Sequence, residues 1–257
     1  MIEIHPTAIV HPGVQIGADC FIGPYCVIGE HVSLGEACRL HAHVVMDGHT
    51  TLGCRNEIFP FACIGLRTQD LKWKGGMTRT EIGDDNTFRE YVTIHSATQD
   101  GDVTRVGSHN HLLAYCHVAH NALIGNHVIM SNVATLAGHV KVEDYAVIGG
   151  LAAVHQFCRI GTMSIIGGCS KVVQDVPPFM LVDGNPGQTR TVNKVGMKRN
   201  GVSEEAQTAI KQAYKLLFRE GLAIPNALAR IEAELPSLPE IQHLVAFARS
   251  SERGLSK

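Results

Sequence analysis

The chain has 257 residues, 45% of them apolar and only 5% aromatic, and its formal net charge is −2. The near-neutral charge excludes the strongly basic surface that a nucleic-acid-binding protein needs. The scarcity of aromatic rings favours a slim core built in thin layers, within one or two domains.

The N-terminal stretch MIEIHPTAIVHPG has no basic segment and no long apolar run. We therefore expect no signal peptide and no membrane-spanning segment. The eight cysteines form no C-x-x-C pair, and five of them share one register of the repeat described next: Cys20, Cys26, Cys38, Cys116 and Cys158. They are expected to be small buried side chains in a reduced, cytoplasmic protein, not parts of a disulfide framework.

A six-residue repeat organises most of the chain. The repeated apolar residues are Ile4, Val10, Ile16, Ile22, Ile28, Leu34, Leu40, Met46, Leu52, Ile58, Ile64, Ile82, Phe88, Ile94, Val106, Leu112, Val118, Ile124, Met130, Leu136, Val142, Ile148, Val154, Ile160, Ile166 and Val172. A period of six predicts an all-β parallel β-helix, with the repeated residue pointing inward and a following glycine easing the corner. Three hexads would close one triangular coil, so residues 18 apart should stack about 4.8 Å apart.

Two stretches interrupt the repeat, at residues 66–81 and 96–105. The first, LRTQDLKWKGGMTRTE, contains the only tryptophan, and the second, SATQDGDVTR, is polar. Loops that leave a regular scaffold often carry function, although tolerated surface insertions would look the same.

The repeat ends near residues 176–178, and helical patterns follow. The stretch GVSEEAQTAIKQAYKLLFREG predicts a helix capped by Ser203, with an apolar face of Ala206, Ile210, Ala213, Tyr214 and Leu217. Two shorter helices are expected at 227–235 and 241–249, separated by Pro236 and Pro239. We therefore expect a β-helix over residues 1–189 and a small α-helical domain over 190–257 that covers the open end of the stack.

Charge is uneven along the chain, because residues 190–257 carry 11 Lys and Arg against 7 Asp and Glu. Most of the excess lies between Arg190 and Arg219, which predicts an acidic partner for this region. An ordinary solvated helix face would account equally well for Lys211 and Lys215.

The stretch AYCHVAHNALIG at residues 114–125 contains two histidines, which the coil length places in a larger cluster. Residues His120, Gly138 and Gln156 should form one column, with three histidines close to it: His117, His139 and His155. Three neutral imidazoles could bind a divalent metal ion, or one could act as a general base while others orient a polar substrate. Gly138 favours the second, because a residue without a side chain leaves a notch where its N–H could face an oxyanion.

The sequence resembles the UDP-N-acetylglucosamine acyltransferases that begin lipid A synthesis in Gram-negative bacteria. The matching stretches run in the family's order over nearly the whole chain: QDLKWKG, REYVTIH, HVAHNALIGN, ATLAGHV, VHQFCRIG, QDVPPF, GNP and GMKRNGVS. The resemblance implies a left-handed parallel β-helix with a helical C-terminal domain. It also implies a homotrimer with active sites between the subunits.

The activity that the resemblance implies is transfer of an (R)-3-hydroxyacyl chain from acyl carrier protein to the glucosamine 3-hydroxyl of UDP-N-acetylglucosamine. His120 would be the general base and the Gly138 N–H would stabilise the oxyanion, with no covalent acyl-enzyme. Neither a metal nor a cofactor is implied beyond the phosphopantetheine arm of the carrier protein, which would dock on the basic C-terminal region. The residues expected to contact the substrates are Gln69, Asp70, Lys72, His117, His139, His155, Gln156, Gly168, Asn193 and Arg199. Glycine at residue 168 leaves the acyl groove open and predicts a longer chain.

Three residues depart from the family pattern: Asn121 where many relatives have Asp, Val195 where Glu is usual, and Asn200 where a second Arg is usual. An amide beside His120 supports its basicity less than a carboxylate does. Because an amine needs less help from a base, the 3-amino analogue of the sugar nucleotide stays open as the acceptor. A metal-dependent hydratase of the carbonic anhydrase type gives no role to the QDLK loop, and an inert scaffold leaves the histidine column unexplained.

Overall fold

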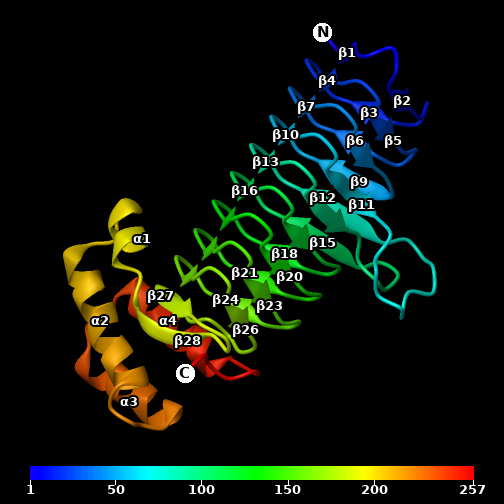
Figure 1. The fold of residues 1–257 in the computed structure, drawn as a ribbon. Helices are drawn as coiled ribbons and strands as arrows, with labels where there is room; N and C mark the ends of the chain where they lie inside the picture. Colours follow the sequence, from blue (N-terminus) through cyan, green and yellow to red (C-terminus); the bar gives the residue numbers. More distant parts are fainter.

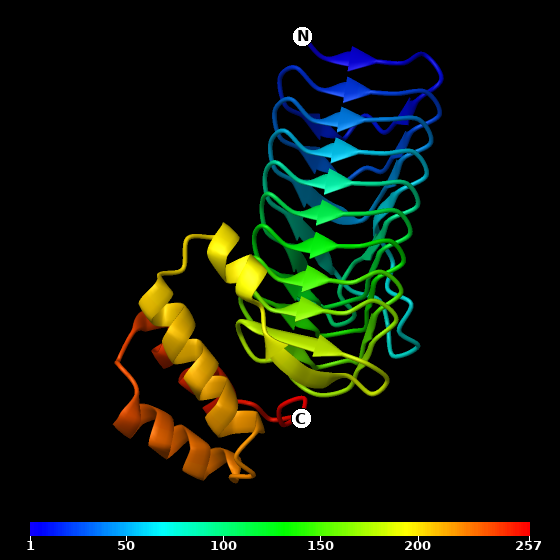
Figure 2. The same ribbon diagram turned by 60° about the vertical axis from the view of Figure 1, so that its left-hand side comes forward.

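The computed structural model describes residues 1–257, which form a left-handed parallel β-helix followed by a small α-helical domain (Figure 1). Short strands wind in triangular coils, with the N-terminus at one end of the stack and the helices beside the other end (Figure 2). The predicted fold class is confirmed. None of the four helices combines the length and the apolar character that a bilayer crossing requires.

Three sheets form the sides of the prism. Sheet A contains β1 (Glu3–Ile4), β4 (Phe21–Ile22), β7 (Arg39–Leu40), β10 (Glu57–Ile58), β13 (Thr87–Phe88), β16 (His111–Leu112), β19 (Ile129–Met130), β22 (Val147–Ile148), β25 (Ile165–Ile166), β27 (Met180–Asp183) and β28 (Gln188–Val192). Sheet B contains β2 (Ile9–Val10), β5 (Val27–Ile28), β8 (Val45–Met46), β11 (Cys63–Leu66), β14 (Thr93–His95), β17 (His117–Val118), β20 (Thr135–Leu136), β23 (Ala153–Val154) and β26 (Lys171–Val172). Sheet C contains β3 (Gln15–Ile16), β6 (Ser33–Leu34), β9 (His49–Leu52), β12 (Arg79–Ile82), β15 (Val103–Val106), β18 (Leu123–Ile124), β21 (Lys141–Val142) and β24 (Arg159–Ile160).

Residues 18 apart stack in neighbouring coils, as the period predicts. In sheet B, His117 pairs with Thr135, and Thr135 pairs with Ala153. The two interruptions increase the spacing between paired residues but leave the strand pairing intact. Thr93, for example, pairs directly with His117 across the second interruption. The coil geometry therefore continues past both loops.

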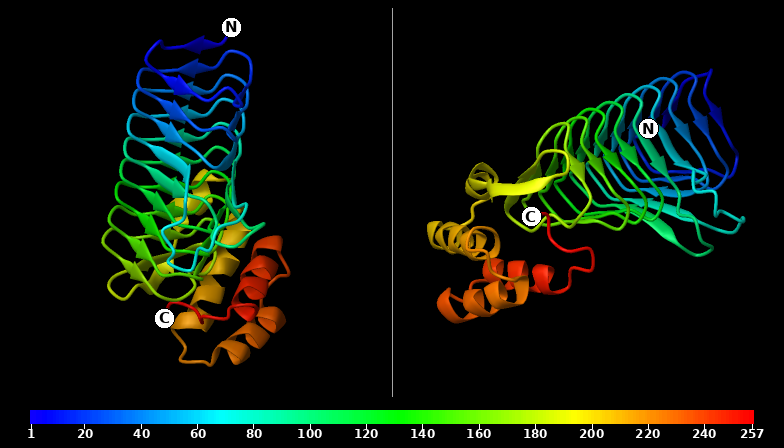
Figure 3. Two further views of the ribbon diagram at one scale, coloured as in Figure 1. Left: turned by 90° about the vertical axis from the view of Figure 1, so that its right-hand side faces the viewer. Right: turned by 60° about the horizontal axis from the view of Figure 1, so that its bottom comes forward.

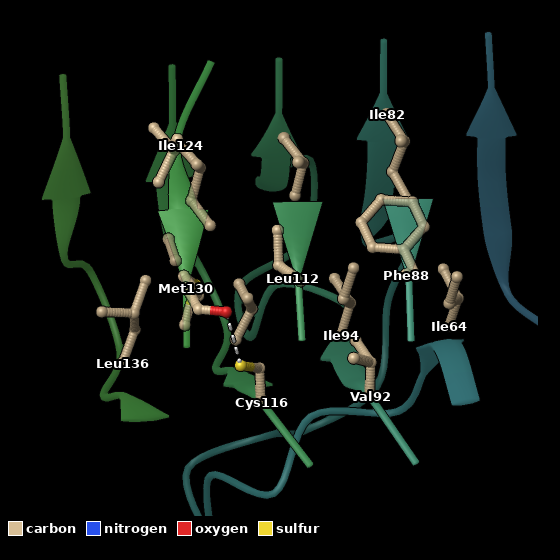
Figure 4. Close-up of a cluster of buried hydrophobic side chains, with 14 of the residues drawn as sticks. Ile64, Ile82, Phe88, Val92, Ile94, Leu112, Cys116, Ile124, Met130 and Leu136 are labelled. Carbon is tan, nitrogen blue, oxygen red and sulfur yellow. Dashed lines mark hydrogen bonds between the residues drawn. The ribbon is translucent and has the colours of Figure 1, made fainter. Parts of the chain in front are cut away.

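The repeated apolar residues form one continuous column inside the coils. From Ile22 onward each of them is at most 4% exposed, whereas Ile4 is 43% exposed because no coil covers the first one. Cys116 fills a small position between larger side chains, with its Sγ 3.4 Å from the Met130 carbonyl oxygen (Figure 4). All five register cysteines are buried, as predicted.

The glycines that follow the repeated residues relieve a steric demand, as predicted, and the crowding comes from the next coil. A Cβ on Gly35 would lie 2.5 Å from the carbonyl carbon of Gly53, so a side chain is excluded by the close approach of the next coil. The left-handed backbone angles of the corners fall two residues later, on residues such as Tyr25 (φ 59°) and Asp19 (φ 59°). Since a Cβ disfavours this conformation, stacking between the coils must hold it in place.

Both interruptions are shorter than predicted, because β12 and β15 begin before the hexad register resumes. The first loop spans residues 67–78 and the second loop spans 96–102. They leave the same edge of the prism (Figure 3) and contact each other, since the Met77 N–H donates to Asp100 Oδ1 at 2.7 Å. The hydroxyl oxygens of Thr68 and Thr98 form a second bridge at 3.0 Å.

Four helices follow the β-helix: α1 (Lys194–Arg199), α2 (Glu204–Phe218), α3 (Ile224–Glu234) and α4 (Pro239–Arg249). The predicted apolar face of α2 is buried, and Ser203 caps the helix by accepting from the Ala206 N–H. Helix α4 begins at Pro239, earlier than predicted, because proline fits the first helical turn, where its missing N–H has no partner. Helix α1 was not predicted, since six residues give too few turns for a periodic pattern.

The β27–β28 hairpin joins the two parts of the chain, and the predicted boundary at 189/190 falls inside β28. Met180 and Val192 of the hairpin belong to a second core of 19 buried residues, formed mainly by the helices. The C-terminal tail returns to the last coil, where the Ser256 N–H donates to the Asp175 carbonyl at 2.9 Å.

His243 of α4 ties the helical domain to the β-helix through Glu143. The His243 Nε2 lies 2.7 Å from Glu143 Oε2, which also accepts from the N–H and hydroxyl of Thr162. The bond to Glu143 raises the pKa of His243. Burial alone would raise the pKa of Glu143, but the hydrogen bonds outweigh burial and lower it.

Both shifts make the pair most stabilising in mildly acidic solution. The His243 contribution is complete below the unfolded pKa of about 6.5 and is lost as pH rises through the raised value. The Glu143 contribution is complete above the unfolded pKa of about 4.3 and is lost as pH falls through the lowered value.

We expect His243→Gln to lower the thermal unfolding midpoint at pH 5.5 by about 2–4 °C, and by less at pH 8.5. The effect is modest because the His243 side chain is 41% exposed and solvent screens the pair. Thermal scans at the two pH values measure it. The matched control is His127→Gln, since His127 is exposed and stacks on His109 and Tyr145. Equal losses at both pH values for His243→Gln would contradict the assignment.

Candidate active site

The corner between sheets B and C carries the predicted histidine column. The His139 N–H donates to the His120 carbonyl at 3.0 Å, and the Phe157 N–H donates to the Gly138 carbonyl at 3.1 Å. These bonds stack His120, Gly138 and Gln156 in successive coils. The predicted layering is therefore confirmed.

The space beside Gly138 holds the imidazole of His120, where the sequence predicted an open notch. A Cβ on Gly138 would overlap His120 Nε2 and lie 2.5 Å from Cε1. The Gly138 N–H donates to no backbone carbonyl. Glycine therefore lets the ring lie against the backbone and leaves an N–H unpaired next to it.

A chain of hydrogen bonds orients His120 on its Nδ1 side. Nδ1 lies 2.9 Å from Asn121 Oδ1, which also accepts from the Thr98 N–H at 3.1 Å. Asn121 Nδ2 donates to Asp102 Oδ2 at 2.8 Å. A carboxylate only accepts and a backbone N–H only donates, so these partners fix which end of the amide faces the ring. The proton of the neutral ring therefore sits on Nδ1, and Nε2 keeps a free lone pair.

The first loop brings a carboxylate to the Nε2 side of the ring. Asp70 Oδ2 lies 3.7 Å from His120 Nε2, and the two side chains are 22% and 14% exposed. Asp70 is held in place because its N–H donates to Thr68 Oγ1 at 3.0 Å and its Oδ1 accepts from the Lys72 N–H at 2.9 Å. A carboxylate at this distance stabilises the imidazolium that forms when His120 takes up a proton.

Three further imidazoles surround His120. The His139 ring meets it edge-on with 5.2 Å between centroids, and His117 Nδ1 lies 2.7 Å from Thr93 Oγ1. Burial, reinforced by His95 and His120, lowers the pKa of His117 to about 4. Burial likewise lowers the pKa of His139 and of His95. These rings are therefore neutral near pH 7 and can contact a polar substrate without repelling a protonated His120.

His95 also belongs to the histidine cluster, although the 18-residue spacing of the coils did not predict it. Its side chain is buried, its ring lies edge-on to His117 at 5.4 Å, and its Nδ1 has no hydrogen-bond partner. A buried polar atom without a partner is costly unless a ligand satisfies it. The second loop lengthens the spacing between paired residues from 18 to 24, as between Thr93 and His117, so counting by 18 does not find His95. The stretch REYVTIH that ends at His95 was nevertheless one of the motifs of the resemblance.

The other predicted contact residues fall into two groups. Four are at the surface near the corner or on the first loop: Gln69, Lys72, His155 and Gln156. Three do not join His120 within one chain: Gly168, where an added Cβ would meet the Gly150 carbonyl oxygen at the opposite edge of sheet B, and Asn193 and Arg199 of the α1 region. The Asn193 side chain caps α1 through the Gly196 N–H and donates to the Met163 carbonyl, so its polar atoms are engaged within the fold.

A cleft of about 680 Å³ adjoins the corner and runs along the outer face of sheet C. It begins at His139 and Phe157, and its charged lining consists of Lys141, Glu143, Arg159, Asp175, Glu252 and Arg253. No group of three or more His, Cys, Asp or Glu side chains is arranged to hold a metal ion. An oriented imidazole with a free Nε2 fits general base catalysis.

Comparisons with known proteins identify relatives of this chain. Residues 3–30 and 13–48 match the family described as bacterial transferase hexapeptide (six repeats), and residues 175–256 match UDP N-acetylglucosamine O-acyltransferase, domain 2. The acyl-[acyl-carrier-protein]–UDP-N-acetylglucosamine O-acyltransferase of Thermodesulfovibrio yellowstonii is 50% identical over 258 residues, covering 100% of both chains.

Solved structures show the same likeness. LpxA from Acinetobacter baumannii is 43% identical with a TM-score of 0.96, covering 99% of each chain. LpxA from Bacteroides fragilis, a UDP-N-acetylglucosamine acyltransferase, is 39% identical with a TM-score of 0.97, covering 99% of this chain and 100% of its own.

The fold and the site together define an acyltransferase of the hexapeptide-repeat class. Within that class, the chain belongs to the UDP-N-acetylglucosamine O-acyltransferase family. The resemblance that the sequence motifs indicated is confirmed.

Proposed function

We propose that this enzyme transfers an (R)-3-hydroxyacyl chain from acyl carrier protein to the glucosamine 3-hydroxyl of UDP-N-acetylglucosamine, the first step of lipid A biosynthesis. The observation that carries the proposal is the orientation of His120, whose Nδ1 faces Asn121 Oδ1 at 2.9 Å. This contact leaves Nε2 free to accept a proton. The activity named for the Thermodesulfovibrio yellowstonii relative supports the substrate pair.

The reaction needs one base and no covalent intermediate. His120 Nε2 removes the proton of the sugar 3-hydroxyl while the hydroxyl oxygen attacks the thioester carbonyl carbon. This step forms a C–O bond and a tetrahedral oxyanion. The unpaired Gly138 N–H would donate to this oxyanion. The C–S bond then breaks, and His120 returns the proton to the departing phosphopantetheine thiolate. No cofactor takes part beyond that carrier-bound arm.

The residues around His120 give the substrate its polar contacts. Asp70 and Lys72 would hold the sugar nucleotide from the first loop, with His117, His139, His155 and Gln156 around the sugar and acyl chain. The charge of Asp70, 3.7 Å from Nε2, also stabilises the protonated base. Gly168 and Arg199 would join the site from a neighbouring subunit, Gly168 bordering an acyl groove for a longer chain and Arg199 meeting the diphosphate.

The carrier protein would dock on the basic C-terminal region. Seven basic side chains there are exposed and form no ion pair with a carboxylate: Arg190, Lys194, Lys198, Arg199, Lys211, Lys215 and Arg219. Unpaired positive charges on one region favour an acidic partner and speed its association. The eight free thiols support a reducing compartment, the cytoplasm.

Sheet B is the side on which a homotrimer would assemble. Its outward residues from β2 to β23 carry no fixed charge: Ile9, Val27, Val45, Cys63, Thr93, His117, Thr135 and Ala153. Sheets A and C instead present residues such as Arg39 and Glu57, or Arg105 and Arg159. An uncharged face of this length favours contact with another chain. Because His117 lies on it, the active site would sit between subunits.

We expect Val45→Arg to dissociate the trimer, because it would bury a positive charge without a partner in the contact between sheets B. Light scattering after size-exclusion chromatography should then give 27.8 kDa in place of three times that mass. Thr51→Arg is the matched control, since it adds the same charge to the same coil on the exposed side of sheet C. A trimeric Val45→Arg variant, or a dissociated control, would overturn the assignment of sheet B.

The decisive test of the function is a turnover assay with purified enzyme, a panel of 3-hydroxyacyl carrier proteins and UDP-N-acetylglucosamine. We expect an ester product, with a longer acyl chain preferred. Absence of transfer to any acceptor would refute the proposal.

A second acceptor is favoured by one observation: His120 Nδ1 faces an amide oxygen, and an amide supports the base less than a carboxylate. The 3-amino analogue of the sugar nucleotide, a better nucleophile, would then give an amide product. Running both acceptors in the same assay decides between them, and a clear preference for the 3-hydroxyl sugar would rule out the amine.

A further inference from the structure

Asp102 lies at the end of the second loop, immediately before β15. It contacts neither His120 nor Gly138 directly. Its Oδ2 accepts from Asn121 Nδ2 at 2.8 Å, while Asn121 Oδ1 faces His120 Nδ1 at 2.9 Å. A negative charge and the imidazole are therefore joined through one amide group.

Two features of the amide make this connection effective. Its orientation is fixed at both ends, because the Thr98 N–H donates to Oδ1 and Nδ2 donates to Asp102. The backbone of Asn121 is also anchored, since its N–H donates to Thr104 Oγ1 at 2.8 Å. Its carbonyl is also a stronger acceptor than an isolated amide, because hydrogen bonds in a chain polarise one another. The second loop thus delivers a charge that the residue beside His120 lacks.

We propose that Asp102 is a positioning residue of the acyl transfer: it holds Asn121 so that the amide oxygen accepts the Nδ1 proton of His120, and it supplies through the amide the negative charge that a carboxylate at residue 121 would supply directly. This inference rests on the proposed function. It also explains the departure at residue 121, since two carboxylates at residues 102 and 121 would lie within hydrogen-bond distance and repel each other.

Other titratable groups also face His120, and the test must separate them from Asp102. They are Asp70 from the first loop, His95 from β14, His117 from β17 and His139 from the next coil. None of these contacts Asn121 through a hydrogen bond. The charge of Asp102 also acts on His139, so the tautomer of His120 is the readout that reports the Nδ1 side by itself.

The first measurement needs no substrate. In enzyme labelled with ¹⁵N-histidine, the ring signals of His120 should report a neutral tautomer with its proton on Nδ1. Asp102→Asn should lose this single-tautomer signature, because an amide at residue 102 can present its NH₂ to Asn121 and release the orientation. Retention of the wild-type signature in Asp102→Asn would overturn the proposal. The result stands even if the enzyme uses another substrate.

The second measurement is kinetic. Asp102→Asn should lower kcat about tenfold with little change in the KM for the sugar nucleotide, and should move the acidic limb of the kcat/KM profile to lower pH. The charge-swapped double variant, Asn121→Asp with Asp102→Asn, should recover most of the loss because one carboxylate again faces an amide. Failure of the swap to recover activity, while Asp102→Asn is impaired, would mean that residue 102 acts only on loop structure.

Asp100→Asn is the matched control. It neutralises a carboxylate of the same loop, whose Oδ1 accepts from the Met77 N–H at 2.7 Å and has no contact with Asn121. We expect its tautomer signature and pH profile to match wild type. An equal shift in both variants would assign the effect to the loop as a whole and refute a specific role for Asp102.

Discussion

His120→Ala is expected to lower kcat about a thousandfold, within the range that a positioned general base contributes. KM for UDP-N-acetylglucosamine should change little, because the base acts mainly in the transition state and Asp70 and Lys72 remain to hold the sugar. The Gly138 N–H is also retained, so a slow residual transfer should persist above the uncatalysed rate.

The measurement is steady-state turnover with a 3-hydroxyacyl carrier protein and the nucleotide sugar, for wild type and variant in parallel. His111→Ala serves as the control, because His111 is an exposed residue on sheet A, away from the corner between sheets B and C. Turnover close to wild type in His120→Ala would eliminate the base assignment. A comparable loss of turnover in His111→Ala would show that the loss comes from poorly folded protein and not from removal of the base.

Gly138→Ala is expected to lower kcat about a hundredfold, since displacing a catalytic group by about 1 Å has effects of this size. The new Cβ would lie 2.5 Å from His120 Cε1 and overlap Nε2. The coil backbone cannot move away, because its hydrogen bonds to both neighbouring coils fix it. The imidazole must therefore swing outward and give up its contact with Asn121. Overpacking would also cost about 1–3 kcal/mol of stability.

Gly13→Ala is the matched control for this variant. Its Cβ would meet the Glu30 carbonyl oxygen at 3.0 Å, in the exposed first coil and far from His120 along the stack. We expect full activity for the control and a displaced His120 ring in a crystal structure of Gly138→Ala. An active Gly138→Ala enzyme would show that the close fit of ring and backbone is not required for catalysis.

The column of His120 and Gly138 could be predicted from the sequence because both lie in coils of constant length. Between residues 106 and 172 no insertion disturbs the count, so adding 18 to a residue number finds its neighbour. The same arithmetic fails at His95, which precedes the second loop. Its ring lies edge-on to that of His117, which follows in the chain only after the second loop has left the coil and returned.

The residues that tune the base could not be found in this way. Asp70 and Asp102 come from the two loops, and their positions beside His120 and Asn121 depend on hydrogen bonds such as Thr68 to Thr98. From the sequence, the amide at Asn121 predicted weaker support for the base. The structure places Asp102 behind that amide, which restores part of the missing charge.

The sequence by itself determined the winding of this protein, its inward column and the layering of His120 on Gly138. These follow from a local period, because identical short strands can satisfy their backbone hydrogen bonds only by stacking in register. Only the tertiary structure decided which nitrogen of His120 is free, which carboxylates support it, and that the Gly138 gap is filled by the ring. These features depend on two loops that lie outside the six-residue repeat and on side-chain hydrogen bonds between different coils. Their positions are therefore set by the folded chain as a whole and not by a local sequence pattern.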